Sequence, residues 1–202
     1  MIRIESMLSA RLFLSPQRLG RRLYFISNLS GRLSLYAMDW GGSVPEPLLP
    51  PEIALQNPKL MPGKPFHLLP DLGQILVMID QDGDENYQPM LIPLAGGYPE
   101  PAFGAALANY RVHLAKCDSG YGLAYLVAES RSESMIECFR GDLRAHSLEL
   151  MGKSRWGVVA DGVSHDHTRA ILSTGYTTGD NVLHLWRRGA GEAQVLYGTP
   201  LE

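Results

Sequence analysis

Short apolar stretches recur along the chain, with starts roughly fifty residues apart. Polar segments rich in Gly, Asp, Ser and Asn separate them. The recurring stretches are Leu23–Asn28, Ile75–Asp80, Leu123–Ala128 and Ala170–Gly175. Continuous apolar runs of this length are typical of strands that are buried on both faces. Each stretch therefore predicts a β-strand in the interior of a repeated unit.

A second apolar stretch follows each of these strands after a polar turn. These second stretches are Leu33–Met38, Met90–Leu94, Met135–Phe139 and Val182–Trp186. Four short strands in a unit of roughly 40 to 50 residues are the sequence signature of a β-propeller. We predict an all-β fold, a partial or half propeller of about four four-stranded blades. One propeller region would cover 1–202, with approximate blades at 13–50, 66–101, 110–152 and 158–198.

Two copies of the repeat share a glycine pair. The strings are GGSVPEP at Gly41–Pro47 and GGYPEP at Gly96–Pro101. A phosphate-binding loop requires GxxxxGK[ST], or GxGxxG before a helix, and neither pattern occurs. Because the pair recurs at the same place in two units, it predicts a turn between the third and fourth strands. Only Ile2–Leu12 and the Ala-rich segment 102–109 look helical. The first predicts a short turn, and the repeat register favours a loop and an outer strand for the second.

Composition and charge indicate a soluble globular protein with no nucleic-acid partner. The net charge is −3, and apolar residues make up 45% of the chain. The arginines form no basic stripe of the kind that follows a phosphate backbone. Cys117 and Cys138 lack metal-ligand spacing and predict two reduced thiols. No apolar run is long enough to span a membrane, and Arg11 interrupts any signal-peptide core, so we expect a cytoplasmic protein.

The segment Asp80–Asn86 contains six oxygen-bearing side chains in a tight loop between two predicted strands. Calcium prefers such ligands, but the glycine and the final glutamate of an EF-hand loop are not at their required positions. A hairpin turn is the favoured interpretation, and a bound cation is the alternative.

A second polar cluster, His165-Asp166-His167, has two histidines that would point to the same side of an extended segment. Spacing identifies no third metal ligand, although the fold could bring His146 or His184 close. Polar residues in the loop leading into the fourth unit are the favoured interpretation.

No motif for nucleophilic catalysis occurs in the chain. An exposed nucleophilic serine on a strand-to-helix turn requires GxSxG, which is absent. The aromatic side chains fall mostly at strand positions, which predicts packing between blades rather than a stacking platform. We therefore assign no catalytic, cofactor-binding or metal-ligating residue from the sequence, and we expect no cofactor.

The segment Tyr24–Tyr36, followed by Asp39 and Gly41-Gly42, resembles the repeated blade of two groups of propellers. One group is the prolyl oligopeptidase superfamily, particularly its acylaminoacyl-peptidase and dipeptidyl-peptidase branches, and the other is the TolB-type propellers. The segment Ser15–Phe25 is similar to the "SPDGk.iaF" string that opens such blades. The segment Asp80–Tyr87 is similar to a structural "D.DG.Eny.l" hairpin of the acylaminoacyl-peptidase branch.

The resemblance to the peptidases implies a non-catalytic propeller that gates and selects peptide substrates for a separate α/β-hydrolase domain. That domain would follow the propeller and has no counterpart in this chain. The paired glutamates that bind a substrate amino terminus in dipeptidyl peptidases have no match either. The alternative is a free-standing TolB-like propeller that binds a protein or a small ligand. A sugar- or polyuronate-acting propeller enzyme would need a clustered metal site, which the sequence does not supply.

Four blades that keep the curvature of a larger propeller would leave apolar faces exposed at both ends. Two chains that pair symmetrically would cover such faces. The other partner, implied by the resemblance to the peptidases, is the missing C-terminal catalytic domain. We therefore expect a homodimer or an aggregation-prone monomer rather than a compact four-bladed monomer.

Overall fold

The computed structural model describes residues 11–55, 58, 64–80, 84–177 and 179–201. It contains four antiparallel sheets of four strands each, and in every sheet the strands lie side by side in chain order. The strands are β1 (Phe13–Leu19), β2 (Arg22–Ser27), β3 (Ser34–Asp39), β4 (Glu46–Pro47), β5 (Phe66–Leu69), β6 (Gln74–Ile79), β7 (Gln88–Pro93), β8 (Glu100–Pro101), β9 (Tyr110–Asp118), β10 (Leu123–Ser130), β11 (Ile136–Asp142), β12 (Ser147–Ser154), β13 (Val159–Val163), β14 (Arg169–Thr177), β15 (Asp180–Arg187) and β16 (Gln194–Tyr197). One 3₁₀ turn, η2 (Pro70–Leu72), joins β5 to β6. The predicted all-β class and the four-stranded units are confirmed.

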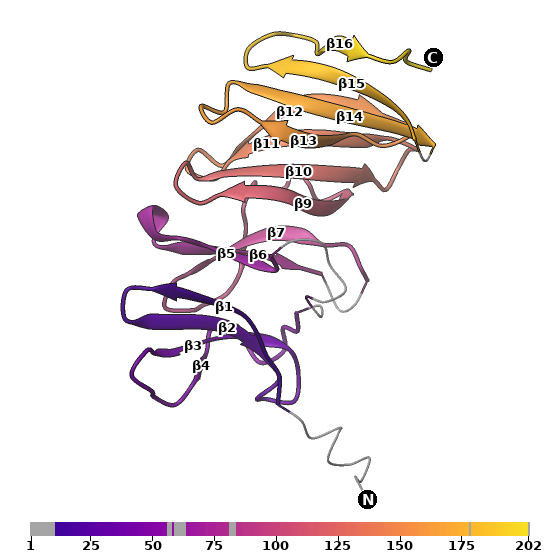
Figure 1. Cartoon of the computed structure of the whole chain (residues 1–202). Helices are drawn as coiled ribbons and strands as arrows, with labels where there is room; N and C mark the ends of the chain where they lie inside the picture. The colour runs from indigo at the N-terminus through magenta and orange to yellow at the C-terminus, as the bar shows by residue number, and fades with distance from the viewer. Residues whose placement is uncertain (1–10, 56–57, 59–63, 81–83, 178, 202) are drawn as a thin grey trace, which may run out of the picture.

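The four sheets are stacked in chain order, from β1–β4 at one end to β13–β16 at the other (Figure 1). Three clusters of buried apolar side chains hold the stack together, one between each pair of neighbouring sheets. Within the described ranges, no such cluster joins the first sheet to the fourth. The sheets therefore form an open stack rather than a closed ring of four blades.

Strand β6 shows how the sequence encodes this stacking. Its side chains alternate between the two faces of the sheet, as in any strand. Ile75 and Val77 pack in the cluster shared with the first sheet, whereas Leu76 and Met78 pack in the cluster shared with the third. Because neighbouring sheets cover both faces of β6, consecutive positions are apolar, and the strand lacks the polar–apolar alternation of a half-exposed strand. The prediction that such runs are buried on both faces is confirmed for this strand.

The glycine pairs lie where the repeat predicts, between β3 and β4 and between β7 and β8. The second pair also makes a contact between blades. Gly96 has a φ of +88°, and a Cβ there would lie 2.9 Å from the Cα of Leu48 in the first unit. The backbone N–H of Gly97 donates to the Leu48 carbonyl at 3.0 Å. Glycine is therefore required at Gly96 both for its backbone conformation and for this close approach.

Two further expectations concern segments outside the strands. Most of Ile2–Leu12 lies outside the described residues. The segment 102–109 forms a series of turns between β8 and β9, with no outer strand of its own. Phe103 of this segment is 5% exposed and packs over Gly141 of β11, where a Cβ would lie 2.4 Å from the ring. The ring therefore occupies the space that a larger residue at Gly141 would fill.

In the part of the chain that the structure describes, no helix is long and apolar enough to cross a membrane.

Candidate functional site

The antiparallel order divides the turns of each blade between two ends of the sheets. Turns between first and second strands, and between third and fourth strands, lie at one end. Turns between second and third strands lie at the other end, together with the connections from one sheet to the next. A cavity opens at this second end, where segments of the first two blades meet the connection to the third.

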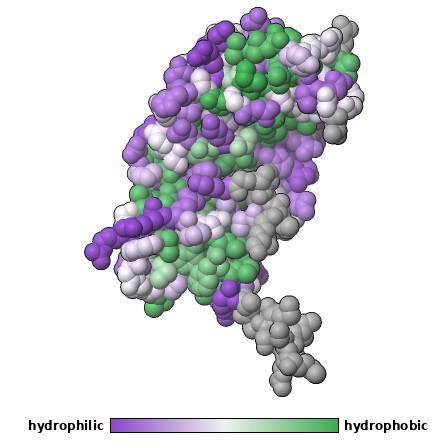
Figure 2. Space-filling view, viewed as in Figure 1, coloured by the Kyte–Doolittle hydropathy of each residue, from purple (hydrophilic) through white to green (hydrophobic). Residues whose placement is uncertain are grey.

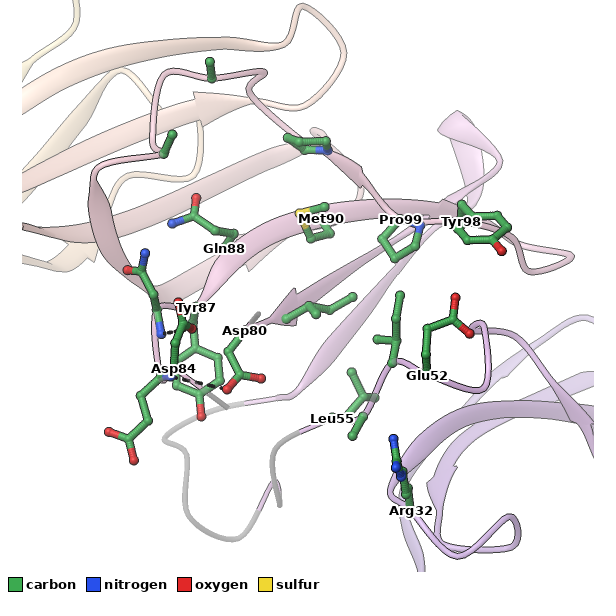
Figure 3. Close-up of a pocket in the computed structure, with 18 of the residues that line it drawn as sticks. Arg32, Glu52, Leu55, Asp80, Asp84, Tyr87, Gln88, Met90, Tyr98 and Pro99 are labelled. Carbon is green, nitrogen blue, oxygen red and sulfur yellow. Dashed lines mark hydrogen bonds between the residues drawn. The ribbon is translucent and has the colours of Figure 1, made fainter. Parts of the chain in front are cut away.

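The cavity has a volume of about 1340 Å³ and is built from three connections (Figure 3). Glu52 and Leu55 come from the connection between the first and second sheets, and Asp80 and Asp84 come from the β6–β7 turn. Ala105 comes from the connection between the second and third sheets. Pockets for single small molecules are typically about 300 to 1,000 Å³, so this cavity has room for a larger ligand.

Apolar side chains form the floor of the cavity. Ile79 and Leu55 are buried, and Met90 of β7 is partly buried beside them. In Figure 3, Met90 lies between the Glu52 side and the Asp80 side of the cavity. Tyr98 is 74% exposed and adds an accessible aromatic ring to the lining. A ligand with an apolar portion would therefore remove hydrophobic surface from water on binding.

Carboxylates dominate the polar part of the lining. It contains Glu52, Asp80, Asp84 and Glu85, and the one cationic side chain among the described lining residues is Arg32. Asp80 accepts a hydrogen bond from the backbone N–H of Glu85 at 3.4 Å, and Asp84 accepts one from that of Asn86 at 2.8 Å. These bonds fix both carboxylates on the β6–β7 turn.

The negative electrostatic potential of the cavity affects the pKa of Tyr87, which also lines it. Burial raises the pKa of its hydroxyl, and the negative charges of Asp80 and Glu85 raise it further. Arg111 opposes this effect, and it lies 3.8 Å from the carboxylate of Glu85. The cavity therefore combines an apolar floor with a negative potential.

The acidic segment predicted as a hairpin turn is part of this lining. Its described residues do connect β6 to β7, as a hairpin turn requires, whereas Asp82 and Gly83 lie outside the described residues. Among the residues that the structure describes, no group of three or more His, Cys, Asp or Glu side chains is arranged to hold a metal ion.

The histidine segment does not have the geometry that we expected. It is a turn inside the fourth sheet, between β13 and β14, rather than an extended segment leading into that unit. His167 has a φ of +55° and is 4% exposed, whereas His165 is exposed. His146 bonds the Ala102 carbonyl instead of joining them. The alternation expected of a strand fails here because the chain reverses direction.

His167 connects the third and fourth blades. Its Nε2 lies 3.2 Å from the Asp118 carboxylate, and its Nδ1 lies 2.8 Å from the Tyr125 hydroxyl. Because a carboxylate can only accept, Nε2 carries the proton, and in the neutral ring Nδ1 then accepts from Tyr125. Burial alone raises the pKa of Asp118, but backbone N–H groups and His167 together lower it. Both ring nitrogens of His167 therefore have hydrogen-bond partners in the third blade, and the side chain serves to pack the third and fourth blades together.

Both cysteines are free, as predicted. Burial raises the pKa of each thiol, Cys117 and Cys138, to about 12. Since the thiolate is the reactive form, both side chains behave as small apolar groups.

No family model matches this chain, and no curated protein matches it. Solved structures do. A protein described as a dipeptidyl aminopeptidase IV from Bacteroides ovatus matches with a TM-score of 0.63 and 14% identity, over 95% of this chain and 30% of that one. TolB from Acinetobacter baumannii matches with a TM-score of 0.52 and 13% identity, over 94% and 44%. An oligogalacturonate lyase in complex with manganese matches with a TM-score of 0.64 and 12% identity, over 89% and 50%.

The fold is part of a β-propeller. Likeness to both TolB-type and peptidase propellers agrees with the resemblance found in the blade motifs. At these identities the likeness establishes the fold alone. The chain spans half or less of the length of each of the three structures described above.

Proposed function

We propose that this chain is a non-catalytic, peptide-binding propeller that serves as the propeller portion of a prolyl oligopeptidase-like serine peptidase. Its role would be to admit and select peptide segments, and the serine, histidine and aspartate would belong to an α/β-hydrolase domain outside this chain. The blade motifs support the likeness to these peptidases. The chain itself contains no GxSxG string, which agrees with a non-catalytic role.

The observation that carries the proposal is the cavity formed by the first two blades and the connections that follow them. Its volume of about 1340 Å³ suits a stretch of peptide better than a single small molecule. Its lining offers an apolar floor for side chains and polar groups that can bond a peptide backbone. An unstructured segment fits such a cavity more readily than a folded domain does.

A free-standing TolB-like binding propeller is the second candidate. The likeness of the blades to TolB propellers supports it. In that case the same cavity would bind a segment of a partner protein.

Apolar surface at both ends of the stack supports a longer or associated native protein (Figure 2). Phe13 of β1 is 59% exposed, and Tyr197 of β16 is 70% exposed. We propose that further blades of the same native chain cover these end sheets. A homodimer of this chain would cover them as well, and the size of the native product distinguishes the two.

Peptide binding by this chain is directly testable by fluorescence anisotropy. We expect short, unstructured, fluorescein-labelled peptides of mixed sequence to bind saturably and to be recovered uncleaved. A folded domain of comparable charge, labelled in the same way, is the matched control and should not bind. If no peptide binds saturably, or if the chain alone cleaves peptides, the proposed function is wrong.

A further inference from the structure

Four carboxylates surround the apolar floor of the cavity, so a ligand with both an apolar portion and a positive charge would satisfy both parts of the lining. Glu52 and Arg32 lie on one side of the cavity, and Asp80 and Asp84 lie on the other (Figure 3). Arg32 offsets part of this negative charge. A cation placed between the two sides would interact with carboxylates from two separate connections.

The apolar floor excludes a small, fully hydrated cation as the best ligand. Leu55 and Ile79 are less than a tenth exposed, and Met90 packs beside them. Lysine and arginine side chains combine an apolar stem with a charged head, and they commonly lay the stem along apolar surface while the head reaches polar groups. The apolar stem of such a side chain would fit the apolar floor of the cavity, and its charged head would fit the surrounding carboxylates.

We propose that the cavity selects peptide segments carrying a lysine or arginine side chain, with the stem on the Leu55–Met90 floor and the charged head among Glu52, Asp80 and Asp84. This proposal rests on the proposed function, because it names the class of peptide that the same cavity takes. Charge-assisted hydrogen bonds to carboxylates would provide the selectivity.

The test uses capped, otherwise neutral peptides that differ at one central position. That position is lysine, arginine, norleucine, acetyl-lysine or glutamate, and the dissociation constant of each peptide is measured by anisotropy. We expect lysine and arginine peptides to bind about tenfold more tightly than the norleucine peptide, and the glutamate peptide to bind most weakly. Acetylation should remove the advantage of lysine. Raising the salt concentration should reduce that advantage, because partly exposed charges are screened.

Substitutions in the cavity locate the effect. Asp80→Asn and Glu52→Gln keep the size of each side chain and remove its charge, so each should reduce the preference for lysine several-fold without weakening norleucine binding. Glu192→Gln, in the exposed β15–β16 turn, is the matched control and should leave the preference unchanged. Unchanged urea midpoints would show that the variants fold.

The outcomes separate the two proposals. Equal binding of lysine and norleucine peptides would overturn the selectivity proposal and leave the peptide-binding function standing. If the double variant Asp80→Asn/Glu52→Gln still preferred lysine peptides, the selectivity proposal would also be overturned, because residues outside this cavity would then recognise the positive charge. If none of the peptides binds, the proposed function fails as well.

Discussion

Phe66→Ala is expected to destabilise the fold by about 3–5 kcal/mol, the largest effect that we predict for a single substitution. Phe66 lies on β5, the first strand of the second blade, and has no exposed surface. Its ring packs in the cluster between the first two sheets. Truncation to alanine removes buried apolar area and leaves a cavity that a close-packed interface fills only in part. Urea unfolding of both proteins measures the difference.

Phe13→Ala is the matched control for this prediction. Phe13 lies on β1, is 59% exposed and has its ring centroid 5.5 Å from that of Phe25. Its removal should cost less than about 1 kcal/mol, because most of the ring already faces water. Equal losses from the two substitutions would mean that the contact between the first two sheets contributes little to stability, contrary to the stack described above.

A loss of stability between pH 7 and pH 4 is the second large effect, and we assign part of it to His67. Burial, together with the nearby positive charge of Lys64, lowers the pKa of this side chain from 6.5 to about 4. The unfolded chain therefore takes up a proton near pH 6.5, whereas the folded chain remains neutral at this site until about pH 4. The contribution of the neutral imidazole is complete above pH 6.5 and is lost as the pH falls from there to 4, by up to about 3 kcal/mol.

The measurement compares the pH dependence of urea unfolding for the unmodified chain and for His67→Gln. The variant cannot titrate at this position, so its stability should fall less between pH 7 and pH 4 by up to about 3 kcal/mol. His165→Gln, at an exposed histidine of the fourth sheet, should retain the full pH dependence. Parallel pH profiles for the unmodified chain and His67→Gln would contradict this assignment.

The repeat could be predicted from sequence because burial between blades constrains every position of strands such as β6. Ile75 and Leu76 point to opposite faces, yet both must be apolar, and this produces the continuous runs that define the period. The turn at Gly96 could be predicted in the same way, since its string repeats. The open arrangement of the stack does not follow from the repeat, because a period does not fix the angle between neighbouring blades.

The cavity could not be predicted, because no periodic signal marks it. Glu52, Asp80 and Ala105 lie in three connections whose lengths and sequences differ, and only the stacking of sheets brings them together. The acidic segment at Asp80 is visible in the sequence, but its pattern indicates a hairpin turn or a cation loop rather than a cavity wall. The role of His167 was also missed, since its partners in the third blade are far away in sequence. Its left-handed backbone in a tight turn has no clear sequence signal.

In this fold the strands provide stability, and the connections between them provide the residues of the proposed binding site. Buried strands such as β6 and β10 supply three packed interfaces and leave little freedom for polar chemistry. The connections are free to vary and carry the charged groups, as loops on rigid scaffolds commonly do. This arrangement suits recognition, as the proposed function requires.

The most direct test of the central claim is the size and reactivity of the native gene product in the cells that make it. The lysate is treated with a fluorophosphonate probe for serine hydrolases, and an antibody against this chain then identifies the product. We predict a labelled band of roughly three times the 22.3 kDa of this chain, as expected for a propeller joined to a hydrolase domain. An unlabelled band at 22.3 kDa would contradict the peptidase account and leave a free-standing binding propeller.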